Sequence, residues 1–477
     1  MVGGKGWHPL IQFEMRIKIL LFFVCLSFFT FIVRAQSLKI GVITDLHYMD
    51  SALLIREGSA FDKYTKGNRV LLKESPVIVK AAVKRLIKDS VDLVLITGDL
   101  TKDGEYVSHK GVIKELTPLL ENGIKVLVIP GNHDVNSKQA FGFDGDSLKA
   151  VATITSLEFR QLYGDFGYNT AIQVDANSLS YVSEPVEGLR IICIDDCEFQ
   201  NKLQTRQWVL RQIATAKALG KQVLAMMHHN VVEHFDHEGS FPYYMTDSFE
   251  VVQRELMEAG LTAVFTGHFH ATDISLLSDN KGNNLYDVAT GSLSAYPCPY
   301  RIVEMSDDTF RINTKYIDSI DIYYNQGFKV YARREAERRF SDILNSLVDR
   351  YYPRISASVP KMAAPFIDIP DKESLKKLAS RLFPGATELV LAHYCGNENL
   401  VDSASFKRDS LLSNIDIFVR ELSKASAGMW SNLIERTIQN SDELRKLKEI
   451  VISIWDDDIN ETLGPVNDLN LTIVLRK

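Results

Sequence analysis

Cysteine and basic charge are both in short supply in this chain. The 477 residues contain only five Cys, and none of them belongs to the His- and Asp-rich motifs described below. A structural zinc knuckle, which needs thiolate ligands, is therefore not expected. Lys and Arg number 54 against 61 Asp and Glu, which gives a net charge of −7 at pH 7 with His neutral. That balance excludes the basic surface typical of proteins that coat nucleic acids, and no internal repeat or low-complexity tract is present.

The N-terminal segment has the pattern of a secretory signal peptide. Arg16 and Lys18 precede an apolar run, residues 19–33, and the short sequence Arg-Ala-Gln-Ser follows it. Charged, apolar and small residues in this order predict that residues 1–36 are a cleaved signal peptide and that the protein is exported. The alternative is an uncleaved membrane anchor, although the apolar run falls just short of a spanning helix. After cleavage no stable membrane span would remain.

Four cysteines would remain in the exported protein: Cys193, Cys197, Cys298 and Cys395. An even number permits disulfides without requiring them. Cys193 and Cys197 flank two Asp at a predicted strand end and are candidates for a pair. The alternative is that all four stay reduced, since a chain of this size can fold without such bonds.

The length suggests two domains. From residue 38 to about residue 314, short apolar strands alternate with amphipathic helices, which is typical of an α/β layer structure with buried strands. The expected strands are Leu38–Thr44, Asp92–Thr97, Lys125–Pro130, Arg190–Asp195, Gln222–His228 and Thr262–Thr266. The expected helices are Pro76–Lys88, Tyr106–Glu121, Thr205–Leu219 and Phe249–Ala259.

The pattern changes toward the C-terminus. Three further apolar runs lack helices between them, and we expect them to form a meander that completes a second sheet: Asn284–Ala289, Tyr300–Met305 and Thr309–Tyr316. Beyond about residue 320, helical spacing predominates over Val330–Tyr351, Lys372–Leu382, Phe406–Ala425 and Asp442–Trp455. The sequence therefore predicts an α/β domain at residues 37–320 and a separate helical domain at residues 321–477.

Five short motifs hold most of the His and Asp residues of interest, and each directly follows a predicted buried strand. In order they are TDLH (44–47), TGDL (97–100), PGNHD (130–134), MMHHN (226–230) and TGHFH (266–270). Ligands of open α/β sheets gather at the carboxyl ends of the strands, so these side chains should meet in one crevice. Asp45 and His47 are separated by one residue, as are His268 and His270, so each pair projects to one side of an extended segment. Carboxylate, amide and imidazole ligands suit Mn, Zn and Fe.

Each motif taken alone has a simpler explanation. A Gly-Asp pair such as Gly98-Asp99 is usually a turn, an Asp before a helix is usually an N-cap, and a His at a strand end is usually a hydrogen-bonded structural residue. Five such motifs at equivalent positions are a different case, because independent turns have no reason to select His repeatedly. The full set therefore indicates a metal site.

The order of the motifs resembles that of the calcineurin-like metallophosphoesterases. The pattern D-x-H, G-D, G-N-H-[DE], an isolated His and G-H-x-H extends over roughly residues 38–300. The resemblance implies a two-sheet α/β sandwich flanked by helices, with two divalent or trivalent metal ions (Mn, Fe or Zn) at its edge. It assigns one metal to Asp45, His47, Asp99 and His270, and the other to Asp99, Asn132, His228 and His268. The shared Asp99 makes physical sense, since a carboxylate can offer one oxygen to each of two cations and an imidazole cannot.

The same resemblance implies a catalytic role for His133, which would protonate the leaving oxygen or stabilise charge on the phosphoryl group. Asp134 is expected to orient His133 and raise its pKa by hydrogen bonding; the alternative role for Asp134 is helix capping. His228 and His229 compete for one ligand position. The family pattern favours His228, but Asn230 replaces the usual Pro.

The expected substrate is a small phosphoester, attacked by a hydroxide that bridges the two metals. An exported protein of this kind, with a helical C-terminal domain, resembles bacterial cyclic-nucleotide or sphingomyelinase-like phosphodiesterases, which would place it in the periplasm or outside the cell. His229, His234 and His237 are candidates for substrate binding, although the last two could lie in a solvated loop. The alternatives are a phosphomonoesterase that uses the same site and a non-catalytic metal-binding scaffold. The sequence leaves the oligomeric state open.

Overall fold

The structure is a computed structural model, and it describes residues 38–197, 202–306, 309–321, 327–357, 371–396, 408–427, 431–455 and 467–474. The predicted signal peptide, residues 1–36, lies outside the described residues. Among the helices that are described, none has both the length and the apolar character needed to cross a membrane.

Two mixed β-sheets form the centre of the molecule. The six-stranded sheet has the order β16 (Asn470–Val474), β15 (Thr309–Tyr316), β14 (Pro299–Ser306), β1 (Leu38–Ile43), β3 (Leu93–Ile96) and β4 (Lys125–Val128). The seven-stranded sheet has the order β12 (Asp273–Ser278), β13 (Asn284–Ala289), β11 (Ala263–Thr266), β10 (Gln222–Met226), β9 (Leu189–Cys193), β8 (Tyr181–Val186) and β7 (Gln173–Val174). A small third sheet contains β2 (Leu54–Arg56), β5 (Phe141–Asp144) and β6 (Ser147–Ala150).

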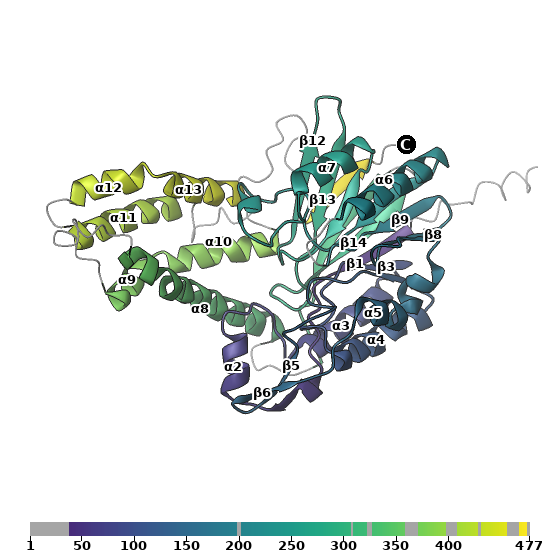
Figure 1. The fold of residues 1–477 in the computed structure, drawn as a ribbon, viewed down its shortest axis with the longest axis horizontal. Coiled ribbons are helices and arrows are strands. Elements are labelled where there is room, and N and C mark those ends of the chain that lie inside the picture. Colours follow the sequence, from purple (N-terminus) through teal and green to yellow (C-terminus); the bar gives the residue numbers. More distant parts are fainter. Residues whose placement is uncertain are drawn as a thin grey trace, which may run out of the picture.

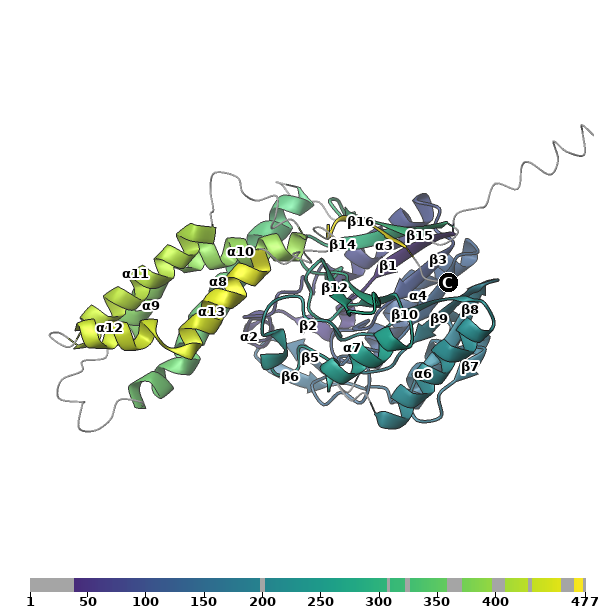
Figure 2. The ribbon, with the colours of Figure 1, turned by 90° about the horizontal axis from the view of Figure 1, so that it is seen from above.

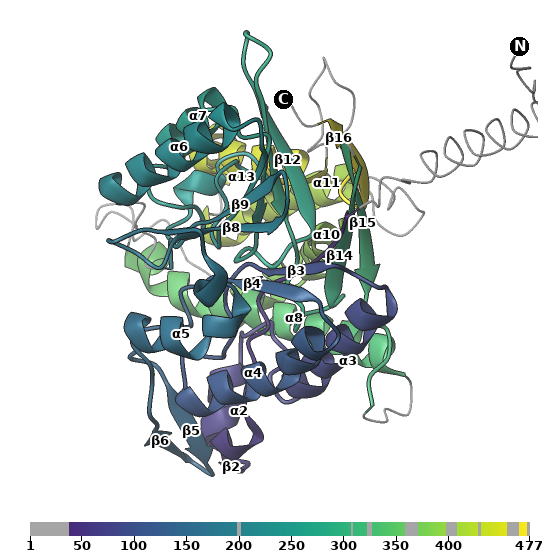
Figure 3. The ribbon, with the colours of Figure 1, turned by 90° about the vertical axis from the view of Figure 1, so that its right-hand side faces the viewer.

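Helices cover the outer face of each sheet. Figure 3 shows α3 (Ser75–Lys88) and α4 (Tyr106–Glu121) beneath the six-stranded sheet, and α6 (Leu203–Ala218) and α7 (Phe249–Glu258) above the seven-stranded one. The amphipathic spacing explains this position, since α3 buries Ile78, Val79, Ala82, Val83 and Leu86 along one side. The predicted two-sheet sandwich flanked by helices is thus confirmed.

The apolar strands are buried on both faces, as their sequences predict. Phe265 of β11 belongs to the core between the two sheets, whereas its neighbour Val264 packs with the residues under α6 and α7. Strands β1, β3 and β4 run parallel, and so do β9, β10 and β11. Their carboxyl ends therefore lie along a common edge within each sheet.

The predicted meander is wrong. Strand β13 lies in the seven-stranded sheet, parallel to β11 and antiparallel to β12, whereas β14 and β15 extend the six-stranded sheet beside β1. Residues 290–298 cross from one sheet to the other, and the Leu293 amide and Ser294 hydroxyl donate to the carbonyls of Thr44 and Leu46. These bonds fix the crossing against the loop after β1. Strands β13 and β14, although consecutive, therefore lie in different sheets.

A helical arm, α8 to α13, extends away from the sheets (Figures 1 and 2). Its helices are α8 (Phe328–Ala357), α9 (Lys372–Ala379), α10 (Phe383–Cys395), α11 (Arg408–Ala427), α12 (Ser431–Gln439) and α13 (Asp442–Trp455). Four of these helices match the predicted ones, while α10 and α12 were not expected. After the arm the chain returns to the sheets, because β16 pairs with β15. The division into two domains near residue 320 stays a prediction.

Cys193 and Cys197 do not form the disulfide that the sequence allows. Both side chains are buried as thiols. Burial also raises the pKa of the Cys193 thiol well above its ordinary value.

Candidate metal centre

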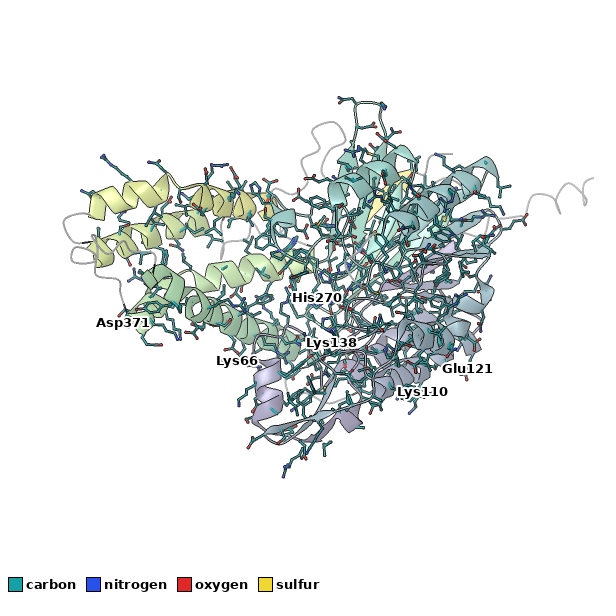
Figure 4. All side chains as sticks on the ribbon, in the orientation of Figure 1. Lys66, Lys110, Glu121, Lys138, His270 and Asp371 are labelled. Carbon is teal, nitrogen blue, oxygen red and sulfur yellow. The ribbon has the colours of Figure 1, made fainter. Side chains whose placement is uncertain are left out.

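The seven predicted metal ligands lie in loops that directly follow β1, β3, β4, β10 and β11. Asp45 and His47 follow β1, Asp99 follows β3, Asn132 follows β4, His228 follows β10, and His268 and His270 follow β11. Figure 4 labels His270, which lies on the side of the sheets that faces the helical arm. The seven residues therefore come together at one edge of the sandwich.

Five of these residues have left-handed backbone conformations. The φ angles lie between 39° and 68° for Asp45, His47, Asp99, His268 and His270. Non-glycine residues avoid this region, and it costs roughly 1–3 kcal/mol per residue unless the surroundings enforce it. Here the backbone amides of Asp45 and His47 donate to the carbonyls of Gly98 and Asp99, each at 3.0 Å. The loops after β1 and β3 thus hold each other in the conformation that turns the side chains inward.

Gly98 and Gly131 make room for this arrangement. Gly98 has a φ of +100°, and a Cβ there would lie 2.5 Å from His228 Nδ1. A Cβ on Gly131 would lie 2.3 Å from Asp99 Oδ1. The glycines in TGDL and PGNHD are therefore needed for close packing of the loops around Asp99.

The first predicted ligand group is compact. His47 Nε2 lies 3.1 Å from His270 Nε2, and Asp45 Oδ1 lies 3.2 Å from His270 Nε2 and 3.7 Å from His47 Nε2. Asp45 Oδ1 is buried and has no hydrogen-bond partner among the described residues. A buried carboxylate oxygen without a donor costs free energy unless a cation compensates for it. The three atoms therefore fit a metal ion.

The second group lies beside the first and shares Asp99 with it. His228 Nε2 lies 3.1 Å from Asn132 Oδ1 and 3.3 Å from Asp99 Oδ2. The same Asp99 Oδ2 lies 3.7 Å from His47 Nε2 in the first group. Asp99 thus lies between the two groups, as expected of a carboxylate that bridges two metals.

Hydrogen bonds to backbone carbonyls orient two of the imidazoles. His228 Nδ1 donates to the Thr97 carbonyl at 2.8 Å, which leaves Nε2 as the ligand atom. His268 Nε2 donates to the Tyr243 carbonyl at 2.7 Å, which leaves Nδ1 for a metal. Burial opposes the ionisation of Asp99, but the charges of His228 and His133 outweigh it and hold the pKa of Asp99 well below its usual range.

His228 and His229, the two candidates for one ligand position, have different contacts. His228 faces Asp99 and Asn132, whereas His229 Nδ1 lies 3.1 Å from Asp196 Oδ2. The ring of His229 packs against His268 at a centroid distance of 4.3 Å. The geometry therefore favours His228 as the ligand, while His229 lies beside His268 and is not among the residues that line the two cavities next to the centre.

His133 lies at the edge of the centre and is about one-third exposed. Its backbone amide donates to Asp99 Oδ1 at 2.9 Å, and its Nδ1 lies 2.8 Å from the Lys102 carbonyl and 3.0 Å from Asp103 Oδ1. A carbonyl can only accept, so Nδ1 carries a hydrogen and Nε2 is available to the cavity. Burial alone would lower the pKa of His133, but Asp99 and Asp103 outweigh it and raise that pKa to about 9.

The prediction that Asp134 hydrogen-bonds to His133 is wrong, and so is the helix-capping alternative. The Asp134 carboxylate accepts from the backbone amides of Leu100, Thr101 and Gly131, and also from the Thr101 hydroxyl. The three bonds from Leu100 and Thr101 tie the loop after β3 to the loop after β4, and the bond from Gly131 closes a turn within the latter loop. Asp134 therefore holds the segments that carry Asp99 and His133 in place.

Asp103 has the role that was predicted for Asp134. Its other oxygen, Oδ2, accepts from Lys102 Nζ and from the Tyr64 hydroxyl, each at 2.6 Å. Lys102 is buried and also contacts Glu105 Oε1 at 2.7 Å. The sequence signal for this network was weak, because a charged loop after a strand is usually a solvated turn.

His234 and His237 do not line the cavities beside the metal centre. His234 is buried, and its Nδ1 and Nε2 lie 3.2 Å from Asp273 Oδ2 and 3.6 Å from Asp287 Oδ1. His237 is partly exposed, and its Nε2 lies 2.8 Å from Glu449 Oε2 of α13. The prediction that these two residues bind substrate is therefore wrong: one joins a buried charge network and the other contacts the helical arm.

Two adjoining cavities open beside the metal centre. The first, of about 320 Å³, is polar, and its lining includes His47, Asp99, His133, His270, Lys66 and Asn68. The second, of about 450 Å³, is lined by Asn132, Pro242, Tyr243 and Tyr244 together with Arg69 and His268. Arg69 and His268 belong to both linings. The sequence did not single out Arg69 or the two tyrosines, since none of them lies in a recognisable motif.

The chain is similar to known proteins of one family. The family model described as calcineurin-like phosphoesterase matches residues 38–272. Two curated proteins described as probable cyclic nucleotide phosphodiesterases are similar over short segments. One, from Vesicomyosocius okutanii, is 43% identical over 56 residues, which is 12% of this chain and 23% of that protein. The other, from Ruthia magnifica, is 39% identical over 61 residues, which is 13% of this chain and 25% of that protein.

The matched segments thus span about a quarter of the length of these relatives. Among solved structures, a dimetal phosphatase from Danio rerio aligns with a TM-score of 0.41 and 15% identity. That alignment covers 58% of this chain and 96% of the zebrafish protein.

Proposed function

We propose that the protein is a two-metal phosphoester hydrolase that prefers phosphodiesters, in keeping with the match of residues 38–272 to the family model described as calcineurin-like phosphoesterase. One observation carries the proposal. Asp99 Oδ2 lies 3.7 Å from His47 Nε2 and 3.3 Å from His228 Nε2, between two groups of metal-binding atoms. A scaffold that bound metal only for stability would not need a cavity at this point, whereas an enzyme would.

The residues present suit two cations. Asp45, His47, Asp99 and His270 would hold one metal, and Asp99, Asn132, His228 and His268 would hold the other. Mn, Fe and Zn all accept this mixture of oxygen and nitrogen ligands. When bound, such a pair would neutralise charge on the phosphoryl oxygens and lower the pKa of a water molecule.

His133 would supply a proton to the leaving oxygen. Its Nδ1 is held by the Lys102 carbonyl and Asp103, so Nε2 is the atom that faces the cavity. Asp103 stabilises the protonated imidazole, and the backbone bond from His133 to Asp99 fixes the ring beside the centre. After the leaving group has taken this proton, solvent can return one, because the side chain is about one-third exposed.

The preference for diesters rests on the second cavity and on the curated relatives. Pro242, Tyr243 and Tyr244 give that cavity an apolar wall next to His268. A diester has a second organic group that such a wall can accommodate, whereas a monoester has a further charged oxygen that it would leave unsolvated. The names of both relatives, probable cyclic nucleotide phosphodiesterase, agree with this preference.

Hydrolysis of bis(p-nitrophenyl) phosphate and p-nitrophenyl phosphate by the purified protein tests the proposal. The protein is first treated with a chelator and then supplied with Mn²⁺, Fe²⁺ or Zn²⁺, and bound metal is measured by mass spectrometry. We expect two metals per chain, negligible turnover without them and faster cleavage of the diester. No turnover with any metal would leave a non-catalytic scaffold, and faster cleavage of the monoester would make the protein a phosphomonoesterase.

We also propose that residues 1–36 direct export to the bacterial periplasm or beyond. The support is the order of charged, apolar and small residues in that segment. Expression of the full chain in a bacterium, followed by cell fractionation and mass determination, tests this. The expected product is periplasmic and has lost about 36 residues; an uncleaved protein in the membrane fraction would indicate an anchor instead.

A further inference from the structure

Arg69 lies where the two active-site cavities meet. It belongs to the loop between α2 (Ser59–Thr65) and α3 and lines both cavities, as His268 does. The polar cavity that it lines also contains three of the predicted metal ligands, His47, Asp99 and His270. Arg69 therefore borders the same cavity as the candidate metal centre.

The contacts of the Arg69 side chain come from the helical arm and from the second cavity. Its Nη1 donates to the Tyr394 hydroxyl of α10, and its Cζ lies 5.5 Å from the centre of the Tyr394 ring. The guanidinium also interacts with the Tyr244 hydroxyl. Both contacts are with phenol oxygens, and within the described part of the chain Arg69 forms no ion pair with a carboxylate.

The backbone on both sides of Arg69 is also fixed by the arm. Arg339 of α8 donates from Nη1 to the carbonyls of Asn68 (3.0 Å) and Val70, the residues that flank Arg69. Arg339 is itself buried. Helices α8 and α10 therefore hold both the loop and the side chain of Arg69.

We propose that Arg69 binds a non-bridging phosphate oxygen of the substrate, and that helices α8 and α10 complete the active site by holding it there. This inference rests on the proposed phosphoester hydrolase function and adds a substrate-binding residue outside the family motifs. Under it, the helical arm is part of the active site and not a separate attachment.

The charge balance of the cleft supports this role. A partly buried guanidinium without a carboxylate partner is costly, and two metal ions beside it would increase the cost. A phosphate group placed between them would contact the guanidinium and both metals, and its negative charge would offset part of their positive charge. A guanidinium has five N–H donors in a planar fork that matches phosphate oxygens, and the two tyrosines do not use all of them.

The position of Arg69 also fits a substrate whose phosphate lies in the polar cavity and whose ester group lies in the apolar one. The polar cavity on one side holds the metal ligands and His133, and the apolar cavity on the other side holds Tyr243 and Tyr244. A phosphate bound by Arg69 would direct its ester group toward the tyrosines. Arg69 is therefore expected to influence substrate affinity more than the chemical step.

The test compares Arg69→Ala, Arg69→Lys and Tyr394→Phe with the wild-type protein, all loaded with Mn²⁺. Three quantities are measured: KM and kcat for bis(p-nitrophenyl) phosphate, the affinity for inorganic phosphate by calorimetry, and bound metal. Loss of hydrogen bonds to a charged group predicts that Arg69→Ala raises KM and weakens phosphate binding roughly 10–100-fold. Bound metal should remain at the wild-type level.

The conservative variants separate binding from folding. Arg69→Lys keeps the charge without the planar fork, so we expect an intermediate loss of phosphate affinity. Tyr394→Phe keeps the ring and removes one acceptor, so a change of roughly threefold to tenfold in KM is expected. If Arg69→Ala fails to fold, these two variants still decide the question.

Arg333→Ala is the matched control. Arg333 of α8 pairs with Glu388 of α10 at 3.0 Å, so it also joins parts of the arm, but it does not line the cavities. We expect wild-type KM and phosphate affinity for this variant. An equal loss in Arg333→Ala and Arg69→Ala would mean that arm stability, and not phosphate binding, is affected.

Two results would overturn the inference. The first is unchanged phosphate affinity and KM in Arg69→Ala with metal retained, which would make Arg69 only a link between the arm and the sheets. The second is a wild-type protein that binds metal but no phosphate. Absence of turnover in a wild-type protein whose phosphate binding depends on Arg69 would instead contradict the proposed hydrolase function alone.

Discussion

The two sides of the active-site cleft are built differently. On the metal side, each side chain follows a buried strand directly, and neighbouring loops hold one another through backbone hydrogen bonds such as that from His47 to Asp99. On the Arg69 side, the functional residue lies in a loop without regular structure, and helices of the arm hold it through Arg339 and Tyr394. Changes on the metal side should therefore act on the chemistry itself, and changes elsewhere on affinity or stability.

Asp99→Asn should have the largest effect of any single substitution. The amide keeps the shape of the side chain but lacks the charge that two cations need, so both metals should be lost. Substitutions of residues that only support metal ligands typically lower activity roughly 10–100-fold, and we expect a larger loss here. Metal analysis, bis(p-nitrophenyl) phosphate hydrolysis and circular dichroism would check this, with the fold retained.

Asp165→Asn is the control for this substitution, since Asp165 is exposed and, among the described residues, its side chain bonds only to the nearby Asn169. It should keep both metals and full activity. A fully active Asp99→Asn protein would contradict the bridging role and the whole ligand assignment with it.

Asp103→Asn should have the next largest effect. Asp103 is not a predicted ligand, so bound metal should be unchanged. Its Oδ1 lies 3.0 Å from His133 Nδ1. Loss of the Asp103 charge should make the protonated imidazole less stable, and this is the form that donates a proton to the leaving oxygen. We expect kcat to fall roughly 10–100-fold, as for other residues that orient a functional group, and KM to change little.

Glu105→Gln provides a matched comparison. Glu105 and Asp103 both contact Lys102 Nζ, at 2.7 and 2.6 Å, but only Asp103 reaches His133. Each variant removes one of the two carboxylates that contact Lys102, so any loss of activity caused by the unpaired Lys102 charge should appear in both. Equal losses of kcat in the two variants would show that neutralising Lys102, and not orienting His133, is what matters.

The same contrast explains which parts of the site the sequence could predict. The clustering of the candidate ligands was predictable because each lies within a few residues of the end of its own strand, as Asp99 does after β3. Arg69, Tyr244 and Tyr394 come from three distant segments, and only the folded chain brings them together. No local pattern distinguishes such residues from ordinary surface positions.

Two errors have related causes. His234 and His237 follow a ligand motif closely in sequence, but β12 and β13 place Asp273 and Asp287 against His234 and make it part of the core. Strands β13, β14 and β15 were expected in one sheet, but residues 290–298 cross between the sheets, so β14 and β15 lie beside β1, away from β13. In both cases long-range packing decided the outcome.

His234→Gln should affect stability and leave the kinetics unchanged. Burial would lower the pKa of His234, but Asp273 and Asp287 outweigh it and raise that pKa well above its usual value. Glu238 and His393 belong to the same network. Removing the buried cation leaves two carboxylates uncompensated, which should cost roughly 3–5 kcal/mol in free energy of unfolding.

The pH dependence of this loss follows from the direction of the pKa change. A histidine whose pKa is raised on folding contributes its full stabilisation below its unfolded pKa of about 6.5 and loses it as pH rises through the folded value. The difference between wild type and His234→Gln in urea unfolding should therefore be largest below pH 6.5 and shrink at alkaline pH. A large change in KM at unchanged stability would restore His234 to the substrate site.

His237→Gln should have the smallest effect. His237 and Glu449 are each about one-third exposed, and ion pairs of this kind contribute roughly 0.2–1 kcal/mol. The pair lies between the 3-10 turn at Glu238–Ser240 and α13, so its loss should not alter the metal centre. A double-mutant cycle with Glu449→Gln, measured by thermal unfolding, would give the coupling energy. A coupling above about 2 kcal/mol, well beyond the range for exposed pairs, or a changed kcat in either variant would mean that this end of the arm is linked to the active site as closely as Tyr394 is.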